Sequence, residues 1–237
     1  MKVYYGGAWH QPHGGYAPTF NPATNQPLVD APIADAIDVD RAVDAASTAF
    51  RTWRATTPET RSAALRRVAA IIRDNIPELA LMDAANNGNP VSLIAKNLDY
   101  GVALVEYFAT LALEAKGSTY PGPRHNLRFS VREPYGVCAR LVAYNHPTLF
   151  LAAKAAPVIA TGNCVIMKAP DQAPLSSMLL IELIQAGCIG VNSIAFHSLG
   201  SPFGGYKQSG IGREECIEEL YEFTQMKTYS VSLGAAN

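Results

Sequence analysis

Apolar residues recur at helical spacing through the first half of the chain. Between Asp38 and Trp53 they fall three or four positions apart, which predicts an amphipathic helix with Asp38 as its cap. A second helix is expected after Thr57, because Pro58 suits the first helical position. Two further helices are expected over residues 77–86 and 91–116, separated by a turn at 87–90 and closed by Gly117. The first half is therefore predicted to be a helical layer.

The pattern changes after the proline- and glycine-rich residues 120–123. From Asn126 to Arg132 apolar and polar residues alternate, as in a half-exposed strand. The elements expected next are a strand at 136–144, a helix opened by Pro147 and closed by Gly162, a strand at 164–168 and a helix at 175–184. Strand, helix, strand and helix in succession indicate parallel α/β architecture.

Beyond Gly187 the parallel pattern stops after two strands. The elements expected there are a short strand at 188–192, a glycine-rich loop up to Gly212, a helix at 214–223 and a final strand at 228–233. A doubly wound sheet normally continues to five or six strands, and two strands alone leave an open edge. The pattern therefore predicts that part of a sheet is missing.

Composition and charge narrow the class of protein. The 237 residues are 49% hydrophobic and 16% charged, which is typical of one or two packed domains. The formal net charge is -1, without a basic stripe, so nucleic acid is not an expected partner. The N-terminus lacks an apolar leader and the longest apolar runs are interrupted by Lys154 and Glu182, so we expect no membrane partner and a cytoplasmic location.

The four cysteines do not form a C-x-x-C pair, which argues against a zinc site, and the expected compartment favours reduced thiols. Cys138, Cys164 and Cys188 lie in apolar strands, where burial raises a thiol pKa. Cys216 is expected in an amphipathic helix beside glutamates, which also disfavour the thiolate. All four are therefore interpreted as structural residues.

Three separated sets of motifs stand in the chain. The first comprises residues 21–24, 38–43, the run ending at Trp53, and Asn87-Gly88; the second comprises 132–137, 144–147, Gly162-Asn163 and 168–176; the third is Pro202-Phe203-Gly204-Gly205-Tyr206-Lys207-Gln208-Ser209-Gly210-Ile211-Gly212-Arg213-Glu214. Together and in this order they resemble the aldehyde dehydrogenase superfamily.

This resemblance implies a partial aldehyde-dehydrogenase-like α/β fold. Its parts would be a helical layer, a truncated Rossmann-like parallel sheet and a β-stranded oligomerisation flap. The expected boundaries are 1–119 for the N-terminal helical part of the cofactor-binding domain, 120–134 for flap strands, 135–187 for the truncated cofactor-binding unit and 188–237 for a C-terminal remnant of the catalytic domain with an oligomerisation tail.

The resemblance also locates a missing interior. In the family, a helix ending like Gln185-Ala186-Gly187 leads into the rest of the cofactor sheet, a glycine-rich loop near the pyrophosphate, a general-base glutamate and the catalytic cysteine. Here residues 188–192 follow at once and resemble the segment just before the family's P-F-G-G motif. The chain is therefore expected to be an internally deleted member that lacks the nucleophile and the base.

Site residues follow from the same motifs. Asn145 resembles the asparagine that holds the oxyanion, although it or His146 could instead cap the helix that begins at Pro147. The expected cofactor-binding residues are Tyr144, Lys168 and Asp171. Lys168 and Asp171 resemble the pair at the adenine ribose of NAD or NADP, and a solvated ion pair on a loop is the alternative.

Aspartate at position 171, where the family usually has glutamate, leaves the choice between NAD and NADP open. The shortened site is expected to bind its cofactor weakly. No metal site is expected, because His10 and His13 form an H-x-x-H in a loop without a third ligand nearby. His146 is interpreted as a packing or capping residue.

Three functions stay open at this point. The family reaction is NAD(P)-dependent oxidation of an aldehyde to a carboxylic acid, which needs a thiolate, oxyanion donors and a base. The favoured hypothesis is a family member that is inactive alone. The alternatives are an aldehyde oxidoreductase completed by another chain or a longer parent form, and a non-catalytic subunit or oligomerisation module. The expected partners are an aldehyde substrate and either a second copy or a full-length homologue.

Overall fold

The structure, a computed structural model, describes residues 1–184 and 214–232. The helices are α1 (Ala36–Trp53), α2 (Pro58–Asp74), α3 (Ile76–Asn87), α4 (Val91–Leu111), η1 (Ala112–Glu114), α5 (Pro147–Ala160), α6 (Leu175–Ile184) and α7 (Ile217–Glu222). The strands are β1 (Val3–Tyr5), β2 (Ala8–His10), β3 (Tyr16–Phe20), β4 (Pro27–Pro32), β5 (Thr119–Tyr120), β6 (Asn126–Pro134), β7 (Val137–Leu141), β8 (Cys164–Lys168) and β9 (Thr224–Ser232). None of the helices in these ranges is long and apolar enough to cross a membrane.

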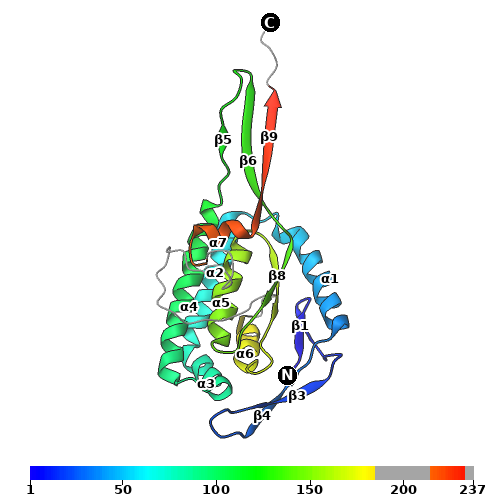
Figure 1. Ribbon diagram of the computed structural model, residues 1–237, viewed down its shortest axis with the longest axis vertical. Coiled ribbons are helices and arrows are strands. Elements are labelled where there is room, and N and C mark those ends of the chain that lie inside the picture. Colours follow the sequence, from blue (N-terminus) through cyan, green and yellow to red (C-terminus); the bar gives the residue numbers. More distant parts are fainter. Residues whose placement is uncertain (185–213, 233–237) are drawn as a thin grey trace, which may run out of the picture.

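The predicted helical layer is confirmed and forms the core. Helix α4 packs against α2, α3 and α5, and the side chains of Leu65, Ile72, Leu98 and Phe108 are almost fully buried between them. Helix α5 is buried on nearly every side, which explains why its sequence is apolar all round. The body of the molecule is therefore a helical bundle with a small parallel sheet beside it (Figure 1).

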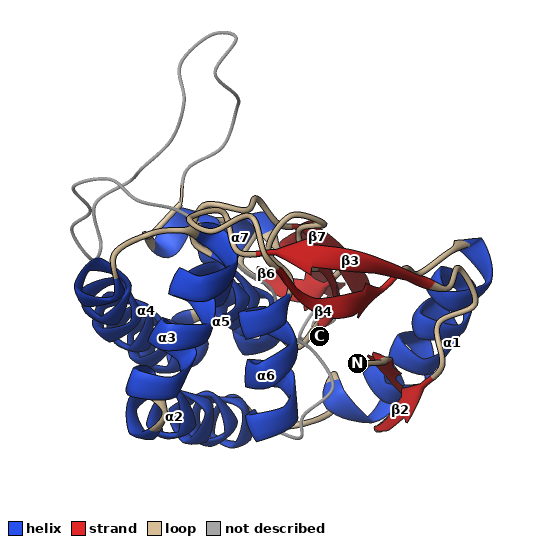
Figure 2. Ribbon diagram, turned by 90° about the horizontal axis from the view of Figure 1, so that it is seen from below, coloured by secondary structure: helices blue, strands red, loops and turns tan. Residues whose placement is uncertain are grey.

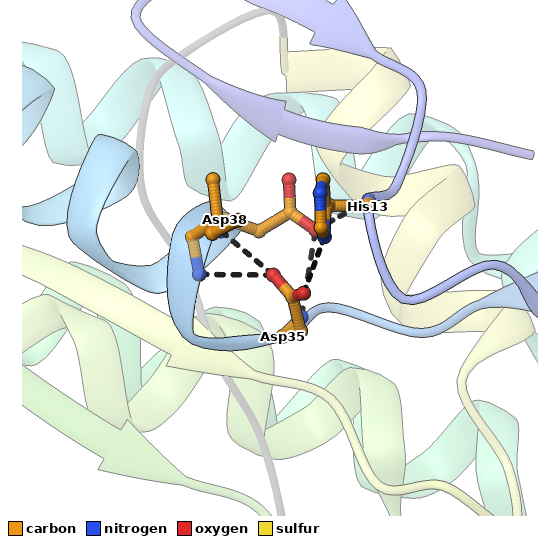
Figure 3. A network of polar contacts seen from close by, with 4 residues as sticks. His13, Asp35 and Asp38 are labelled. Atoms are coloured by element: carbon orange, nitrogen blue, oxygen red, sulfur yellow. Dashed lines mark hydrogen bonds and ion pairs between the residues drawn. The ribbon is translucent and has the colours of Figure 1, made fainter.

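The cap of α1 differs from the prediction. Asp35, and not Asp38, is the N-cap residue, and Asp38 occupies the third helical position of a capping box. The backbone N–H of His13 donates to Asp38 Oδ2 at 2.7 Å, and His13 Nδ1 lies 2.5 Å from Asp35 Oδ2 (Figure 3). Both acids therefore also fasten the N-terminal segment to the start of α1.

The prediction for the first half omitted two hairpins, β1 with β2 and β3 with β4. The first hairpin turns at Gly6 and Gly7, both of which have positive φ values. Two such residues are what a two-residue hairpin turn requires, so Gly-Gly between Tyr5 and Ala8 was the available signal. These strands are short and only partly buried, so no apolar periodicity marks them.

Helix α4 ends earlier than predicted, at Leu111, and continues as the short 3₁₀ turn η1. Gly117 was predicted to close the helix. In the structure it has another role, because its lack of a side chain allows close packing. A Cβ at Gly117 would lie 1.7 Å from the carbonyl oxygen of Ser130, where the chain crosses β6. The glycine therefore permits the close approach of two backbones.

The predicted parallel unit is present as β7 and β8, paired in register from Val137 with Cys164 to Leu141 with Lys168. Strand β8 has the predicted bounds, whereas β7 ends at Leu141, three residues earlier than expected. Helices α1 and α5 both pack against β8, and Figure 2 shows α1 apart from α5 and α6 with β7 above the space between them. Within the described ranges this sheet has two strands.

The predicted flap is a three-stranded antiparallel sheet in the order β5, β6, β9. It projects from the helical body in Figure 1. Strand β6 continues two residues beyond its predicted end, and β9 begins at Thr224, four residues before its predicted start, because the two pair over nine positions from Asn126 with Ser232 to Pro134 with Thr224. The predicted last residue of that strand, Leu233, lies outside the described residues, as do the strand at 188–192 and the glycine-rich loop.

Two buried carboxylates tie distant elements together. Asp83 on α3 accepts a hydrogen bond of 2.6 Å from the Ser176 hydroxyl at the start of α6, and burial raises its pKa to about 6. Glu219 on α7 accepts one of 2.6 Å from the backbone N–H of Glu215, and burial raises its pKa to about 7. Both acids are only 1% exposed, so each ionises inside the protein at a cost.

These raised pKa values predict that the fold loses stability as the pH rises from mildly acidic values to about 7. A buried acid whose pKa is higher in the folded than in the unfolded chain stabilises the fold below its unfolded pKa, and that contribution is lost as pH rises through the folded value. For Glu219 the window runs from 4.5 to about 7. Relative to the parent, Glu219→Gln should therefore gain up to about 3 kcal/mol of unfolding free energy between pH 5 and pH 8.

Urea unfolding at the two pH values measures this difference, with the exposed Glu222→Gln as the matched control on the same helix. This control removes an exposed carboxylate and leaves the buried one in place. If the difference in unfolding free energy between Glu219→Gln and the parent is the same at pH 5 and pH 8, burial does not destabilise the ionised carboxylate.

Candidate functional site

The predicted site residues gather at the carboxyl ends of the two parallel strands. Strand β7 ends at Leu141 and leads through Tyr144 and Asn145 to α5, and β8 ends at Lys168, the register partner of Leu141. In open α/β sheets, ligands bind at this end of the strands. The fold therefore brings the segments that carry the predicted oxyanion and cofactor residues to one edge of the sheet.

Lys168 and Asp171 form an ion pair, with Nζ donating to Oδ1 at 2.5 Å. Their side chains are 52% and 82% exposed, so both groups face solvent. The loop that holds them is anchored at its far end, where Asn86 Oδ1 accepts from the buried backbone N–H of Leu175 at 3.0 Å. A fixed loop thus presents one cation and one anion side by side.

This pair suits the hydroxyl groups of a ribose. A carboxylate accepts hydrogen bonds from hydroxyls, and an ammonium group donates to their oxygen atoms. Because Lys168 and Asp171 are exposed at the end of β8, a ribose can reach both without rearrangement of the core. The chemistry of these two residues therefore fits the ribose of a nicotinamide dinucleotide.

Asn145 is exposed, and its backbone is held from the turn after α3. Its carbonyl oxygen accepts a hydrogen bond of 2.6 Å from Asn89 Nδ2 and one of 3.4 Å from Asn87 Nδ2. Gly88, between the two donors, has a φ of 83°, and a Cβ there would lie 2.8 Å from Pro22. Asn87 and Asn89 therefore position the Asn145 loop, a role that the turn signal alone did not reveal.

His146 is buried at the N-cap position of α5, but its side chain makes no capping hydrogen bond, so the capping alternative is wrong for this residue. Its Nδ1 lies 3.3 Å from Asn97 Nδ2. Burial lowers the pKa of His146 to about 4, so the ring is neutral at physiological pH. Packing and the contact with Asn97 explain this histidine.

A charged cluster that the sequence reasoning missed lies beside the same strand end. Lys154, on the apolar helix α5, donates a hydrogen bond of 2.7 Å to Glu214 Oε2, and Arg140 of β7 lies 3.6 Å from Glu214 Oε1. The three side chains line a cavity of about 340 Å³. A buried lysine requires such a partner, so the single lysine within an apolar helix was the available signal.

The surroundings of the described cysteines disfavour the thiolate form. Burial raises the thiol pKa of Cys138, Cys164 and Cys216, which keeps them protonated near neutral pH. Cys216 is buried at the N-cap position of α7 rather than within the predicted helix. Cys188 lies outside the described residues.

His10 and His13 each contact another side chain of the protein. His10 stacks on the ring of Tyr5 with a centroid distance of 4.0 Å, and His13 contacts Asp35. Among residues 1–184 and 214–232, no group of three or more metal-ligating side chains is close enough to hold an ion.

Comparisons with known proteins place these features in a family. The model described as "Aldehyde dehydrogenase family" matches residues 9–186 and 181–229. Aldehyde dehydrogenase tropH of Talaromyces stipitatus is 43% identical over 187 residues, which are 77% of this chain and 36% of that protein. The chain thus spans little more than a third of this relative.

Solved structures agree. An aldehyde dehydrogenase from Bacillus cereus matches with a TM-score of 0.76 and 29% identity over 80% of this chain and 40% of that one. A betaine aldehyde dehydrogenase from Staphylococcus aureus, in complex with NAD+, matches with a TM-score of 0.75 and 27% identity over 78% and 38%. Because the family model covers most of its residues, and these enzymes match its fold over 78% to 80% of its length, the chain belongs to the aldehyde dehydrogenase family.

Proposed function

We propose that this chain is an aldehyde dehydrogenase family protein without the interior of the fold, and that it does not oxidise aldehydes by itself. The observation that carries the proposal is the way the family model matches. Its two parts, 9–186 and 181–229, meet within α6, while the chain spans only 36% to 40% of the relatives. Two ends of one family sequence therefore adjoin where a long interior is expected.

The chemistry of the described residues supports inactivity. Oxidation of an aldehyde requires a nucleophile that is ionised near neutral pH, and the thiols of Cys138, Cys164 and Cys216 all have raised pKa values. Asn145 keeps the proposed oxyanion position before α5, but an oxyanion forms only after nucleophilic attack. The retained site therefore holds parts that act after a step the chain does not perform.

The cofactor corner is the part of the function that we propose survives in this chain. Lys168 and Asp171 would hold the adenine ribose of NAD or NADP, with Tyr144 exposed on the neighbouring loop. The carboxylate of Asp171 favours NAD, because it accepts from a ribose hydroxyl and repels a 2′-phosphate. Binding should be weak, since the segment that would lie near the pyrophosphate belongs to the interior proposed to be missing.

The test of inactivity is a spectrophotometric assay for aldehyde-dependent formation of NADH or NADPH. The chain alone should give no turnover with aliphatic, aromatic or semialdehyde substrates, while the Talaromyces stipitatus relative serves as a positive control. Loss of a nucleophile costs on the order of a million-fold in rate, which is below detection. Steady turnover that disappears in Cys138→Ser or Cys164→Ser would overturn the proposal.

Weak NAD binding should depend on Lys168. Replacing it with alanine removes the donor at the ribose, so the Kd for NAD should rise roughly tenfold, equivalent to about 1.4 kcal/mol. Isothermal titration calorimetry measures the change, and Lys116→Ala, which removes another exposed lysine that is paired with an acid, Glu114, is the matched control. Tight binding that is unaffected by Lys168→Ala would place the cofactor elsewhere.

The flap supports a further part of the proposal, that the chain self-associates. Strands β5 and β9 are the outer strands of the three-stranded flap, and Leu127, Met226 and Val231 expose about half of their side chains. Open edges with exposed apolar side chains favour pairing with another chain. A homo-oligomer or a complex with a full-length homologue would cover them.

Sedimentation velocity across a concentration series should therefore show a dimer or a larger species. A charge placed on the exposed apolar face, as in Val231→Asp, should shift the distribution toward monomer. Leu81→Asp, at an even more exposed apolar position on α3, should leave it unchanged. A parent chain that stays monomeric at high micromolar concentration would remove the flap as an interface.

A further inference from the structure

A slot runs along the edge of β8 that faces away from β7. It is a cavity of about 320 Å³ whose floor is residues 164–167 of β8. One wall is the face of α1 around Ala42 and Ala46, the other includes Ile181 of α6, and the hairpin turn at Gly6 closes one end. Figure 1 shows β8 between α6 on one side and β1 with α1 on the other.

The floor of the slot is a hydrogen-bonding edge. The backbone N–H of Cys164 donates to the carbonyl oxygen of Gly136 at 2.9 Å, so Cys164 directs its backbone groups toward β7. Successive residues of a strand alternate the direction of these groups. The N–H and C=O groups of Val165 and Met167 therefore point into the slot, where no described strand is paired with them.

The shape and chemistry of the slot define its occupant. Four strand residues extend over about 13 Å, so the floor offers a track for a strand of about four residues. None of the side chains that line the slot is charged, and most are apolar, which disfavours a phosphate or a nucleotide. Small alanine side chains on α1 leave room for a backbone and its side chains above the sheet.

We propose that this slot binds an extended apolar segment of a second polypeptide, which adds to β8 as a third parallel strand. The segment that we expect in the slot is the interior part of an aldehyde dehydrogenase family protein, so this inference rests on the proposed function. The two matched parts of the family meet at residues 181–186, beginning at Ile181, which itself lines the slot. In a parallel sheet, a strand joined to α6 by a right-handed crossover would lie beside β8. We assign that strand to the missing interior, because residues 188–192 resemble a later segment of the family.

A second copy of this chain fits the slot less well. Its own β8 edge lies at the bottom of an identical slot between α1 and α6, so two such edges cannot approach one another. A single extended segment, by contrast, enters between the walls and satisfies the backbone groups of Val165 and Met167. The occupant is therefore a strand without neighbours on the side that meets β8.

Cys164 and Cys138 provide paired reporters. Cys164 lines the slot, whereas Cys138, on the adjacent strand, packs against the helical core. The experiment mixes the full chain with a separately produced segment of Talaromyces stipitatus aldehyde dehydrogenase tropH, namely the part that follows its match to this chain. Alkylation of each thiol by a maleimide at pH 8.5 is then followed by peptide mass spectrometry.

Binding in the slot should slow the alkylation of Cys164 at least tenfold and leave that of Cys138 unchanged. Ala46→Arg, which places a long charged side chain in the slot wall, should abolish this protection, whereas Ser47→Arg, on the exposed face of the same helix, should not. Circular dichroism of both variants verifies that α1 is intact. The protection of Cys164 in the parent chain is measured without either substitution.

Unchanged alkylation of Cys164 at saturating segment, or equal slowing of both thiols, would overturn the proposal. Slower alkylation of Cys164 that persists in Ala46→Arg would also overturn the proposal. The alkylation of Cys164 requires no turnover, so this proposal can be wrong while the proposed function is right. The proposed function is wrong if the isolated chain oxidises aldehydes, whatever the alkylation of Cys164 shows.

Discussion

The side chain of Asn163 is the interaction on which the arrangement of the site depends. Its Oδ1 accepts from the backbone N–H of Gly136 at 2.8 Å, and its Nδ2 donates to Thr161 Oγ1 and to the carbonyl oxygen of Phe223, each at 2.9 Å. It is fully buried, so each unmade bond would cost about 1–3 kcal/mol. One amide thus joins the start of β7, the end of α5 and the end of α7.

This junction explains how the two strands that lead to the candidate site residues are held together. Strand β7 leads to the Asn145 loop and β8 leads to Lys168, and both strands begin next to Asn163. At their other end, Lys154 and Arg140 hold Glu214, so the segment that leads into α7 is tied to α5 and β7. These elements are therefore positioned by contacts among themselves.

The sequence predicted the elements whose signals are local. Strand β8 was correct at both ends because an apolar run is bounded by glycine and by a charged residue, and α2 was correct at its start because Thr57 and Pro58 mark it. The cap of α1 was misplaced because Asp35 and Asp38 are both acids three residues apart, and only backbone geometry separates the cap from its partner. The exposed N-terminal hairpins left no periodic signal.

The site was less predictable, because its contacts join distant parts of the chain. The pair of Lys168 and Asp171 spans three residues and was found, whereas Lys154 and Glu214 are 60 residues apart and no local pattern connects them. The same holds for Asn89, which reaches the Asn145 carbonyl from 56 residues away. Resemblance to a family named the residues, but the structure was needed to show what holds them.

The central claim is that, among the described residues, the parallel sheet ends at β8 and no strand covers its outer edge. Residue-resolved hydrogen exchange tests it most directly, because exchange reports whether each amide is bonded. The account predicts alternation along β8, with slow exchange at Cys164 and Ile166, whose N–H groups face β7, and fast exchange at Val165 and Met167. Equally slow exchange at all four amides would show that another strand already covers the edge, and would contradict the account.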